Sequence, residues 1–348
     1  MPTLFDPVTL GDIACKNRVF MAPMTRSRAG EGDAPTHMNA KYYGQRAGAG
    51  LIITEGVYPN IHGKGYVRTP GIVSDEQIEG WRLVTDAVHE RGGKIVMQLM
   101  HCGRITSRHN KPENSRTLAP SALQAKGEMF TDVAGMVPFE MPEEMTVAEI
   151  KQTIADYGRA AKNAMAAGCD GVELHCTSGY LPAQFLSTGT NKRRDEYGGS
   201  LENRHRFVLE TLSAIIDAVG AGRVGIRICP ANPFNDLHDD SPEETFSALI
   251  GKINPMGLAY LHIIRMKAGV DNIELSKSFN GPIILNDSYG FENGNRALAN
   301  GLAEAISFGR PFIANPDLLE KFAKGGELNR PDFSKLYTAG PKGYSDYE

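Results

Sequence analysis

The sequence predicts a closed (β/α)8 barrel, the TIM-barrel fold, in which eight parallel strands alternate with helices. Three observations support this fold. Eight short apolar runs recur along the 348 residues, segments with helical periodicity lie between them, and the composition does not change along the chain. A barrel with loop insertions accommodates this length, so we expect residues 1–348 to form a single domain.

The eight apolar runs are short enough to be single strands. They span residues 19–22, 51–54, 95–99, 171–174, 224–229, 260–264, 282–285 and 305–308. Eight strands that alternate with helices favour a closed parallel barrel over an open sheet.

The segments between the runs have the spacing of amphipathic helices. The clearest of them span residues 76–91, 147–167, 201–219, 242–253 and 293–302. Ser74 lies just before the first of these segments, where an N-cap is expected, and Gly92 and Gly168 lie just after the first and second segments, where a glycine C-cap is expected.

Residues 104–144 form a long stretch between the third strand and its helix, rich in proline, glycine and polar residues. In a barrel, the loops that follow the strands cover the catalytic mouth. Long loops at such positions are usually functional. We therefore predict that this stretch is a capping subdomain rather than a linker.

Charge and composition indicate a small-molecule partner. The net charge is −4 and lysines and arginines are scattered, so no basic surface for nucleic acid is expected. No stretch approaches the roughly 20 apolar residues of a membrane helix. The N-terminus lacks the basic start and apolar run of a secretory signal. We expect a soluble, cytoplasmic protein that binds neither nucleic acid nor membrane.

The five cysteines show no C-x-x-C spacing, and their number is odd. This pattern argues against a disulfide framework, structural zinc and an iron–sulfur cluster. We expect free thiols and no metal site. A barrel lyase that uses a Schiff base or a metal would need a lysine at a strand end or a His/Asp cluster; Lys267 lies beyond the sixth strand, and the first strand has no H-x-H.

Polar residues follow seven of the eight predicted strands, where a barrel carries its chemistry. Loops are polar for reasons of solvation alone, but this recurrence makes solvation a weak explanation. The polar residues and their immediate neighbours are Pro23, Met24, Thr25 and Arg26; Glu55 and Gly56; Gln98 and His101; His175, Ser178 and Tyr180; Arg227; Asn286, Asp287 and Ser288; and Gly309 and Arg310.

The last strand runs directly into Gly309 and Arg310, and barrels often bind phosphate after their seventh and eighth strands. Glycine lets a phosphate approach the backbone amides, and arginine offers it a charged fork. A glycine turn beside a surface arginine would look the same in sequence. Thr25, Gln98 and Arg227 are expected to project into one central space, an arrangement that would suit an isoalloxazine ring. No G-x-G-x-x-G follows the first strand, which argues against a Rossmann domain.

Six motifs resemble the old yellow enzyme family of FMN-dependent ene-reductases, and the resemblance covers essentially the whole chain. The most specific is HCTSGYLPAQFLS at residues 175–187, followed by NKRRDEYGGSLENR at 191–204. MAPMTR at 21–26, QLMHCGR at 98–104, GIR at 225–227 and FGRPFIANPDL at 308–318 extend the match.

The resemblance implies a barrel that binds FMN and takes hydride from NADPH or NADH. Thr25 would contact the flavin carbonyl near N5, Gly56 and Gln98 would lie along the ring edge, and Arg227 would lie by the N1–C2 carbonyl side. Gly309 and Arg310 would hold the phosphate. The full cofactor set that it implies is Pro23, Met24, Thr25, Gly56, Gln98, Arg227, Asp287, Ser288, Gly309 and Arg310.

The resemblance also implies a ping-pong reduction of the C=C bond of α,β-unsaturated carbonyl compounds, with nitro compounds and nitrate esters as further substrates. His175 would donate a hydrogen bond to the substrate oxygen, Tyr180 would protonate the α-carbon, and Ser178 would assist His175. These three residues and Met100 would line the substrate site. The resemblance leaves a monomer and a homodimer both open.

Three positions depart from the family pattern. Ser178 stands where the family usually has asparagine or histidine, and its hydroxyl donates only one hydrogen bond. Met100 stands where tryptophan is common, which should reshape the pocket. Asp287 and Ser288 stand where many relatives carry two glycines. Because Ser178 leaves the oxyanion clamp incomplete, a flavin-binding barrel with a specialised or weakened activity is the alternative hypothesis.

Overall fold

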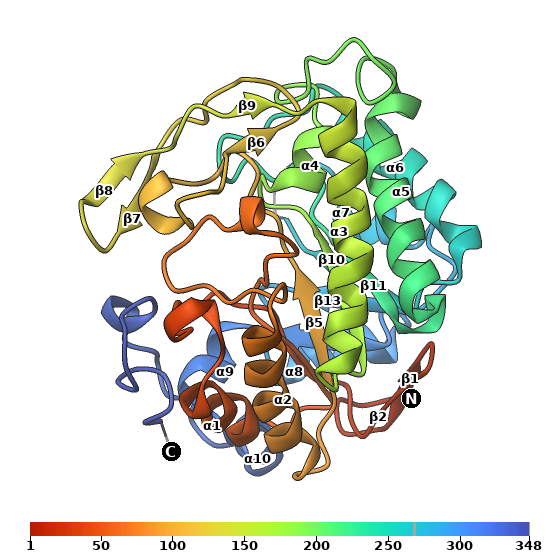
Figure 1. The fold of residues 1–348 in the computed structure, drawn as a ribbon. Helices are drawn as coiled ribbons and strands as arrows, with labels where there is room; N and C mark the ends of the chain where they lie inside the picture. The colour runs from red at the N-terminus through yellow and green to blue at the C-terminus, as the bar shows by residue number, and fades with distance from the viewer. Residues whose placement is uncertain (267–268, 348) are drawn as a thin grey trace.

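The computed structural model describes residues 1–266 and 269–347, and its centre is a closed barrel of eight parallel strands (Figure 1). The strands follow one another around the barrel in the order β3, β4, β5, β10, β11, β12, β13 and β14 before the last pairs with the first. The predicted fold is confirmed. Lys267 lies outside the described residues.

Each barrel strand coincides with one of the eight apolar runs, with ends that differ by at most two residues. The strands are β3 (Val19–Met21), β4 (Leu51–Ile53), β5 (Ile95–Leu99), β10 (Gly171–Cys176), β11 (Val224–Ile228), β12 (Tyr260–Ile264), β13 (Ile283–Asn286) and β14 (Ala305–Phe308). The strand β10 is longer than predicted, and the extension includes His175, which pairs in register with Arg227 on β11.

Helices surround the barrel (Figure 1). The five predicted segments correspond to α2 (Asp75–His89), α3 (Val147–Ala166), α5 (Leu201–Val219), α6 (Pro242–Ile253) and α8 (Phe291–Ala299). Ser74 caps α2 as predicted, and its side chain accepts a hydrogen bond from the backbone N–H of Gln77. The shorter helices are α1 (His37–Gln45), α4 (Leu181–Leu186), α7 (Asn272–Ser276), α9 (Arg310–Ala314) and α10 (Leu318–Lys324).

The apolar core falls into an outer layer and a lumen because successive strand residues face opposite sides of a sheet. Val19, Ile95 and Val172 belong to the larger cluster that includes the helices. Phe20 and Val96 belong to a separate cluster with Leu10 and Ile13 of the N-terminal hairpin, β1 (Val8–Leu10) and β2 (Ile13–Cys15). The hairpin therefore closes the N-terminal end of the lumen.

The C-terminal half of the lumen is polar instead. The side chain of Glu173 on β10 contacts His262 on β12, and His262 contacts Ser307 on β14. Neither pair of strands is adjacent in the sheet, so these contacts cross the interior. All three side chains are buried. The floor beneath the catalytic mouth is thus a buried hydrogen-bonded layer.

Residues 104–144 contribute no strand to the barrel. They carry two small sheets, one in which β6 (Leu118–Ala119) pairs with β9 (Glu143–Glu144), and an antiparallel hairpin of β7 (Glu128–Thr131) and β8 (Gly135–Pro138). The hairpin projects from the barrel at the upper left of Figure 1.

The C-terminal segment, residues 333–347, packs beside α1. The rings of Tyr42 and Tyr344 stack with centroids 4.0 Å apart. Arg26 donates to the carbonyl oxygen of Gly343 at 2.7 Å.

All five cysteines are buried free thiols. Across the described parts of the chain, no helix combines the length and apolar character needed to cross a membrane.

Candidate active site

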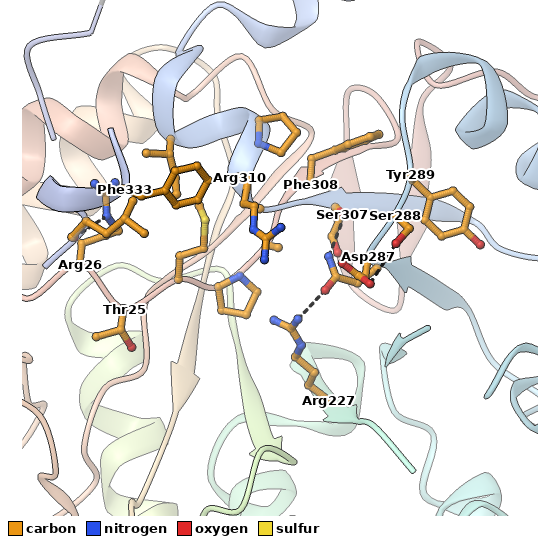
Figure 2. A pocket seen from close by; sticks show the side chains of 18 of the residues that line it. Thr25, Arg26, Arg227, Asp287, Ser288, Tyr289, Ser307, Phe308, Arg310 and Phe333 are labelled. Atoms are coloured by element: carbon orange, nitrogen blue, oxygen red, sulfur yellow. Dashed lines mark hydrogen bonds between the residues drawn. The ribbon is translucent and has the colours of Figure 1, made fainter. Parts of the chain in front are cut away.

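A cavity of about 590 Å³ opens at the C-terminal ends of β3, β11, β13 and β14 (Figure 2). This is the mouth of the barrel, where the fold carries its active sites. Eight of the ten predicted cofactor residues line it, namely Pro23, Met24, Thr25, Arg227, Asp287, Ser288, Gly309 and Arg310. These residues lie on four separate segments of the sequence, and folding brings them to one space.

Arg227 is the buried cation of this cavity. Its Nη2 donates to Asn286 Oδ1 at 2.6 Å, and the side chain is 6% exposed. Its Nε has no hydrogen-bond partner among the described residues. Burial lowers the pKa of Arg227, and the Glu173 carboxylate opposes this shift. A buried, partly unsatisfied guanidinium is costly, so it fits a polar ligand.

Arg310 provides a second cation. Figure 2 shows the side chains of Arg310 and Arg227 pointing into a common space. Gly309 is the N-cap of α9, and a Cβ there would meet Met24 at an ordinary 3.5 Å. Protein packing therefore does not require glycine at residue 309. Two cations and an open backbone at one wall fit an anionic group such as a phosphate.

Asp287 and Ser288 follow β13 in an uncommon backbone conformation, with φ values of 74° and 59°. Residues other than glycine, asparagine, aspartate and histidine rarely adopt this left-handed region, and Ser288 is outside that group. Ser288 Oγ lies 3.1 Å from Asp287 Oδ2 and donates to it. Strain of this kind at a cavity wall is common in ligand sites.

The two remaining cofactor candidates, Gly56 and Gln98, do not line this cavity. Gln98 is buried, and its Nε2 donates to Glu173 Oε1 at 2.7 Å. A Cβ on Gly56 would lie 2.5 Å from the thioether of Met100. Met100 therefore packs directly over Gly56, and a larger residue at position 56 would displace the thioether.

A second cavity, of about 780 Å³, shares Thr25 and Tyr337 with the first. The hairpin of β7 and β8 supplies apolar residues to its wall. Tyr66 and Tyr180 also line this cavity. The cap predicted at residues 104–144 therefore borders a cavity at the mouth. The two cavities meet at residues that follow β3 and in the C-terminal segment.

His175 and Tyr180 lie close together, with ring centroids 5.2 Å apart. His175 Nδ1 has no partner in the described parts of the chain. Burial, helped by Arg227, lowers the pKa of His175 to about 3, so the imidazole is neutral. Burial, helped by Tyr66, raises the pKa of Tyr180 well above its usual value. The pair therefore offers a neutral imidazole and a protonated phenol.

Ser178 lies near this pair in sequence but lines neither cavity. Its φ is 59°, and its Oγ lies 3.5 Å from Asn232 Nδ2, at the limit of a hydrogen bond. The side chain of Asn235 donates to the Ser178 carbonyl oxygen at 2.8 Å. The structure thus anchors the backbone of Ser178 firmly and its hydroxyl only weakly.

Several site residues escaped the sequence analysis. Tyr66 contacts Tyr180, and Phe333, Leu336 and Tyr337 line the cavities from the C-terminal segment. Tyr66 follows a glycine-rich loop, and the C-terminal residues follow no regular period, so neither gave a periodic signal. The sequence signal that these segments do carry is their Gly and Pro content, which indicates turns.

Comparison with known proteins places this site among flavoenzymes. Residues 3–329 match the model of the NADH:flavin oxidoreductase / NADH oxidase family. A probable flavin mononucleotide-dependent alkene reductase of Leishmania infantum is 39% identical over 353 residues, covering 99% of this chain and 96% of the relative. The 12-oxophytodienoate reductase 1 of Oryza sativa subsp. japonica is 39% identical over 356 residues, covering 99% of this chain and 92% of the relative.

Two solved structures are similar along the whole chain. Morphinone reductase in complex with tetrahydroNAD has a TM-score of 0.96 and 43% identity, and the match covers 100% of this chain and 98% of that one. The old yellow enzyme homologue from Zymomonas mobilis has a TM-score of 0.95 and 39% identity, with coverage of 100% and 99%.

Proposed function

Because this chain belongs to the NADH:flavin oxidoreductase / NADH oxidase family, that of the old yellow enzymes, we propose that its two joined cavities hold FMN and an unsaturated substrate. The protein is an FMN-dependent ene-reductase that reduces activated C=C bonds with a nicotinamide donor. The roles of individual residues and the substrate class are our proposals.

The first cavity is proposed as the FMN site. Arg310 and Gly309, with the backbone amides near Asp287 and Ser288, would hold the phosphate. Pro23, Met24 and Thr25 form the facing wall, and Thr25 would contact the carbonyl near N5. Arg227 would stabilise the charge that FMN gains on reduction. Gln98 and Gly56 would border the ring edge.

When bound, FMN accepts hydride from NADH or NADPH and passes it to the β-carbon of the substrate. Since the donor leaves before the substrate enters the same space, the kinetics should be ping-pong. The nucleotide preference between NADPH and NADH is open in this proposal. The expected substrates are α,β-unsaturated carbonyl compounds, nitro compounds and nitrate esters.

The substrate oxygen would accept a hydrogen bond from His175 as charge develops on it. A donor of this kind is typically worth about 3 kcal/mol in the transition state. Tyr180 would deliver the proton to the α-carbon, which commonly contributes about 10²–10⁴-fold in rate. Ser178 would assist His175, and Met100 would shape the pocket over Gly56.

One observation carries this proposal: His175 lines neither cavity itself but adjoins a lining residue of each. It pairs in register with Arg227, which lines the first cavity, and its ring lies 5.2 Å from Tyr180, which lines the second. A neutral hydrogen-bond donor and a protonated acid at such a junction match the needs of C=C reduction.

The test uses the purified yellow holoenzyme in stopped flow. Anaerobic NADH or NADPH should bleach the flavin absorbance, and 2-cyclohexenone should then restore it. A protein that carries no FMN and cannot be reconstituted would contradict the cofactor assignment. A flavin that is reduced but is not reoxidised by any enone would favour the alternative, a specialised or weakened activity, which the weakly held Ser178 hydroxyl supports.

We also propose that residues 1–348 form one FMN-binding domain with residues 104–144 as its cap. A cytoplasmic location, small-molecule partners only, and a monomeric or homodimeric state complete the proposal. The five free thiols support a reducing compartment. The net charge of −4, with lysines and arginines scattered along the chain, supports the absence of nucleic-acid binding.

A further inference from the structure

A continuous hydrogen-bonded layer crosses the barrel lumen beneath the first cavity. Gln98 Nε2 lies 2.7 Å from Glu173 Oε1, and Glu173 Oε2 lies 2.8 Å from His262 Nδ1. His262 Nε2 lies 2.8 Å from Ser307 Oγ. Ser307 and its neighbour Asn286 line the cavity. The layer therefore connects the cavity floor to residues that no motif marked as functional.

The chemistry of the groups fixes the direction of each hydrogen bond. A carboxylate only accepts, so Gln98 and His262 both donate to Glu173. His262 is then protonated on Nδ1, and its Nε2 accepts from the Ser307 hydroxyl. The amide of Gln98 is thereby oriented with its nitrogen toward Glu173. Its Oε1 is left as a free acceptor.

The layer also has a defined charge. Burial would raise the pKa of Glu173, but His262, Arg227 and Gln98 outweigh it, so that pKa is lowered and the carboxylate is ionised. Burial lowers the pKa of His262, and Arg227 adds to this shift although Glu173 opposes it, so the imidazole is neutral. Glu173 is thus a buried anion whose charge acts on Arg227 inside the barrel.

A fully buried carboxylate is expensive, and its replacement by apolar residues is often neutral or stabilising. The exposed fractions of Glu173 and His262 are both 0%. The lower lumen of the same barrel is filled by apolar side chains such as Val96 and Ile284. Stability alone therefore does not explain why the upper lumen contains an acid.

We propose that Glu173 and His262 are positioning residues of the FMN site. Glu173 orients Gln98 so that its Oε1 is available as an acceptor, and its negative charge offsets Arg227 and limits how strongly the protein favours reduced FMN. His262 holds the carboxylate in place. This inference rests on the proposed cofactor site, and it adds two residues to that site that act through Gln98 and Arg227.

The test is the midpoint reduction potential of bound FMN, measured by anaerobic spectrophotometric titration against a reference dye. Glu173→Gln removes one negative charge with little change in volume. It should favour reduced over oxidised FMN about tenfold, which raises a two-electron potential by about 30 mV. Oxidised FMN, titrated into the apoprotein by fluorescence, should bind about threefold more weakly because Gln98 is released.

Asp156→Asn is the matched control. Asp156 is also a buried carboxylate that accepts from a side-chain amide, that of Asn60 at 2.7 Å, but it lies on α3 outside the barrel. This variant should leave the potential unchanged. An equal rise in both variants would show a general effect of lost stability and would overturn the proposal.

Two His262 variants keep the test decisive if Glu173→Gln does not fold. His262→Gln retains an N–H donor to Glu173 and should keep the wild-type potential. His262→Leu removes the donor, favours protonation of Glu173, and should raise the potential. Equal potentials in the two variants would overturn the proposal. Because the titration needs bound FMN but no enone, its failure is distinguishable from a failure of the proposed activity.

Discussion

The hydroxyl oxygens of Tyr66 and Tyr180 lie 2.9 Å apart, a hydrogen-bond distance, at the wall of the second cavity. The two rings meet edge to face, with centroids 6.2 Å apart. Burial raises the pKa of both phenols, that of Tyr180 with a further contribution from Tyr66. Tyr180 is therefore held protonated and is supplied with a neighbour that can return a proton.

Tyr180→Phe should slow flavin reoxidation by 2-cyclohexenone by about 10²-fold or more, the usual contribution of a general acid. Reduction by NADH or NADPH should change little, since that step needs no proton from Tyr180. Stopped flow measures the two steps separately. Tyr66→Phe serves as the comparison and should slow reoxidation less. Equal slowing of both steps by Tyr180→Phe would refute its role as the acid.

Arg310→Ala should weaken the retention of FMN because it removes a charge-assisted contact, worth about 1.5–3 kcal/mol. FMN released on dilution through a desalting column reports the effect. Arg310→Lys keeps the charge but loses the two-pronged guanidinium, so its FMN retention should lie between those of the wild type and Arg310→Ala. Arg330→Ala, an exposed arginine beyond the cavity, is the control and should retain FMN like the wild type.

The fold, and the strand ends that bring eight cofactor candidates to one cavity, were predictable because they depend on local patterns. Apolar runs marked each barrel strand, and strand ends gave Arg227 and Arg310. Glu173 and His262 were not identified, since each sits in an apolar run and meets its partner only across the lumen. Tyr337 was missed for the same reason: its place at the cavities depends on distant contacts, which sequence periods do not encode.

Ser178→Asn should strengthen the hydrogen bonding of a substrate oxygen near His175. Asparagine tolerates the φ of 59° at this position better than most residues, and its amide reaches farther than the serine hydroxyl. The expected gain is about 1–2 kcal/mol in phenol binding and in the barrier to enone reduction.

Titration of a para-substituted phenol by its charge-transfer absorbance, together with stopped-flow reoxidation, measures both effects. Ser178→Ala is the matched variant and should weaken phenol binding and enone reduction only slightly, because Ser178 Oγ has only a long contact with Asn232. If asparagine weakens both, the pocket is shaped around serine for a different substrate, and the specialised activity becomes the better hypothesis.

Glu55→Gln should change the pH dependence of stability. Burial raises the pKa of Glu55 from 4.5 to about 7. The folded state therefore binds the proton more tightly, and the stability that this provides is present below pH 4.5 and is lost as the pH rises to about 7. The loss amounts to about 3 kcal/mol. In denaturant unfolding, the free energy of unfolding of the wild type should fall relative to that of Glu55→Gln between pH 4.5 and 7. Above pH 7 the difference between the two proteins should be constant. A difference that does not vary with pH would contradict the raised pKa.

Arg28 is the anchor of the C-terminal segment that walls both cavities. Its guanidinium is buried and donates to the carbonyl oxygens of Lys335 at 2.7 Å and Leu336 at 2.6 Å. It also donates to the carbonyl oxygens of Gly340 and Lys342 at 3.2 and 3.1 Å. One side chain thus satisfies four backbone acceptors of a segment that lacks long helices or strands of its own.

Arg28→Leu should release this segment and, with it, the wall residues Leu336 and Tyr337. Breaking a buried charged network typically costs about 3–5 kcal/mol, so the segment should open locally while the barrel stays folded. Trypsin should then cut after Lys335 and Lys342 much faster than in the wild type, and FMN and phenol should both bind more weakly.

Arg28→Lys keeps the charge but reaches fewer carbonyl oxygens, so it should give an intermediate rate of trypsin cleavage. Arg330 is exposed and lies just before the same segment. Arg330→Leu therefore controls for the loss of an arginine as such. If Arg28→Leu is cut no faster than this control, Arg26 and the stacked Tyr42 and Tyr344 suffice to hold the segment.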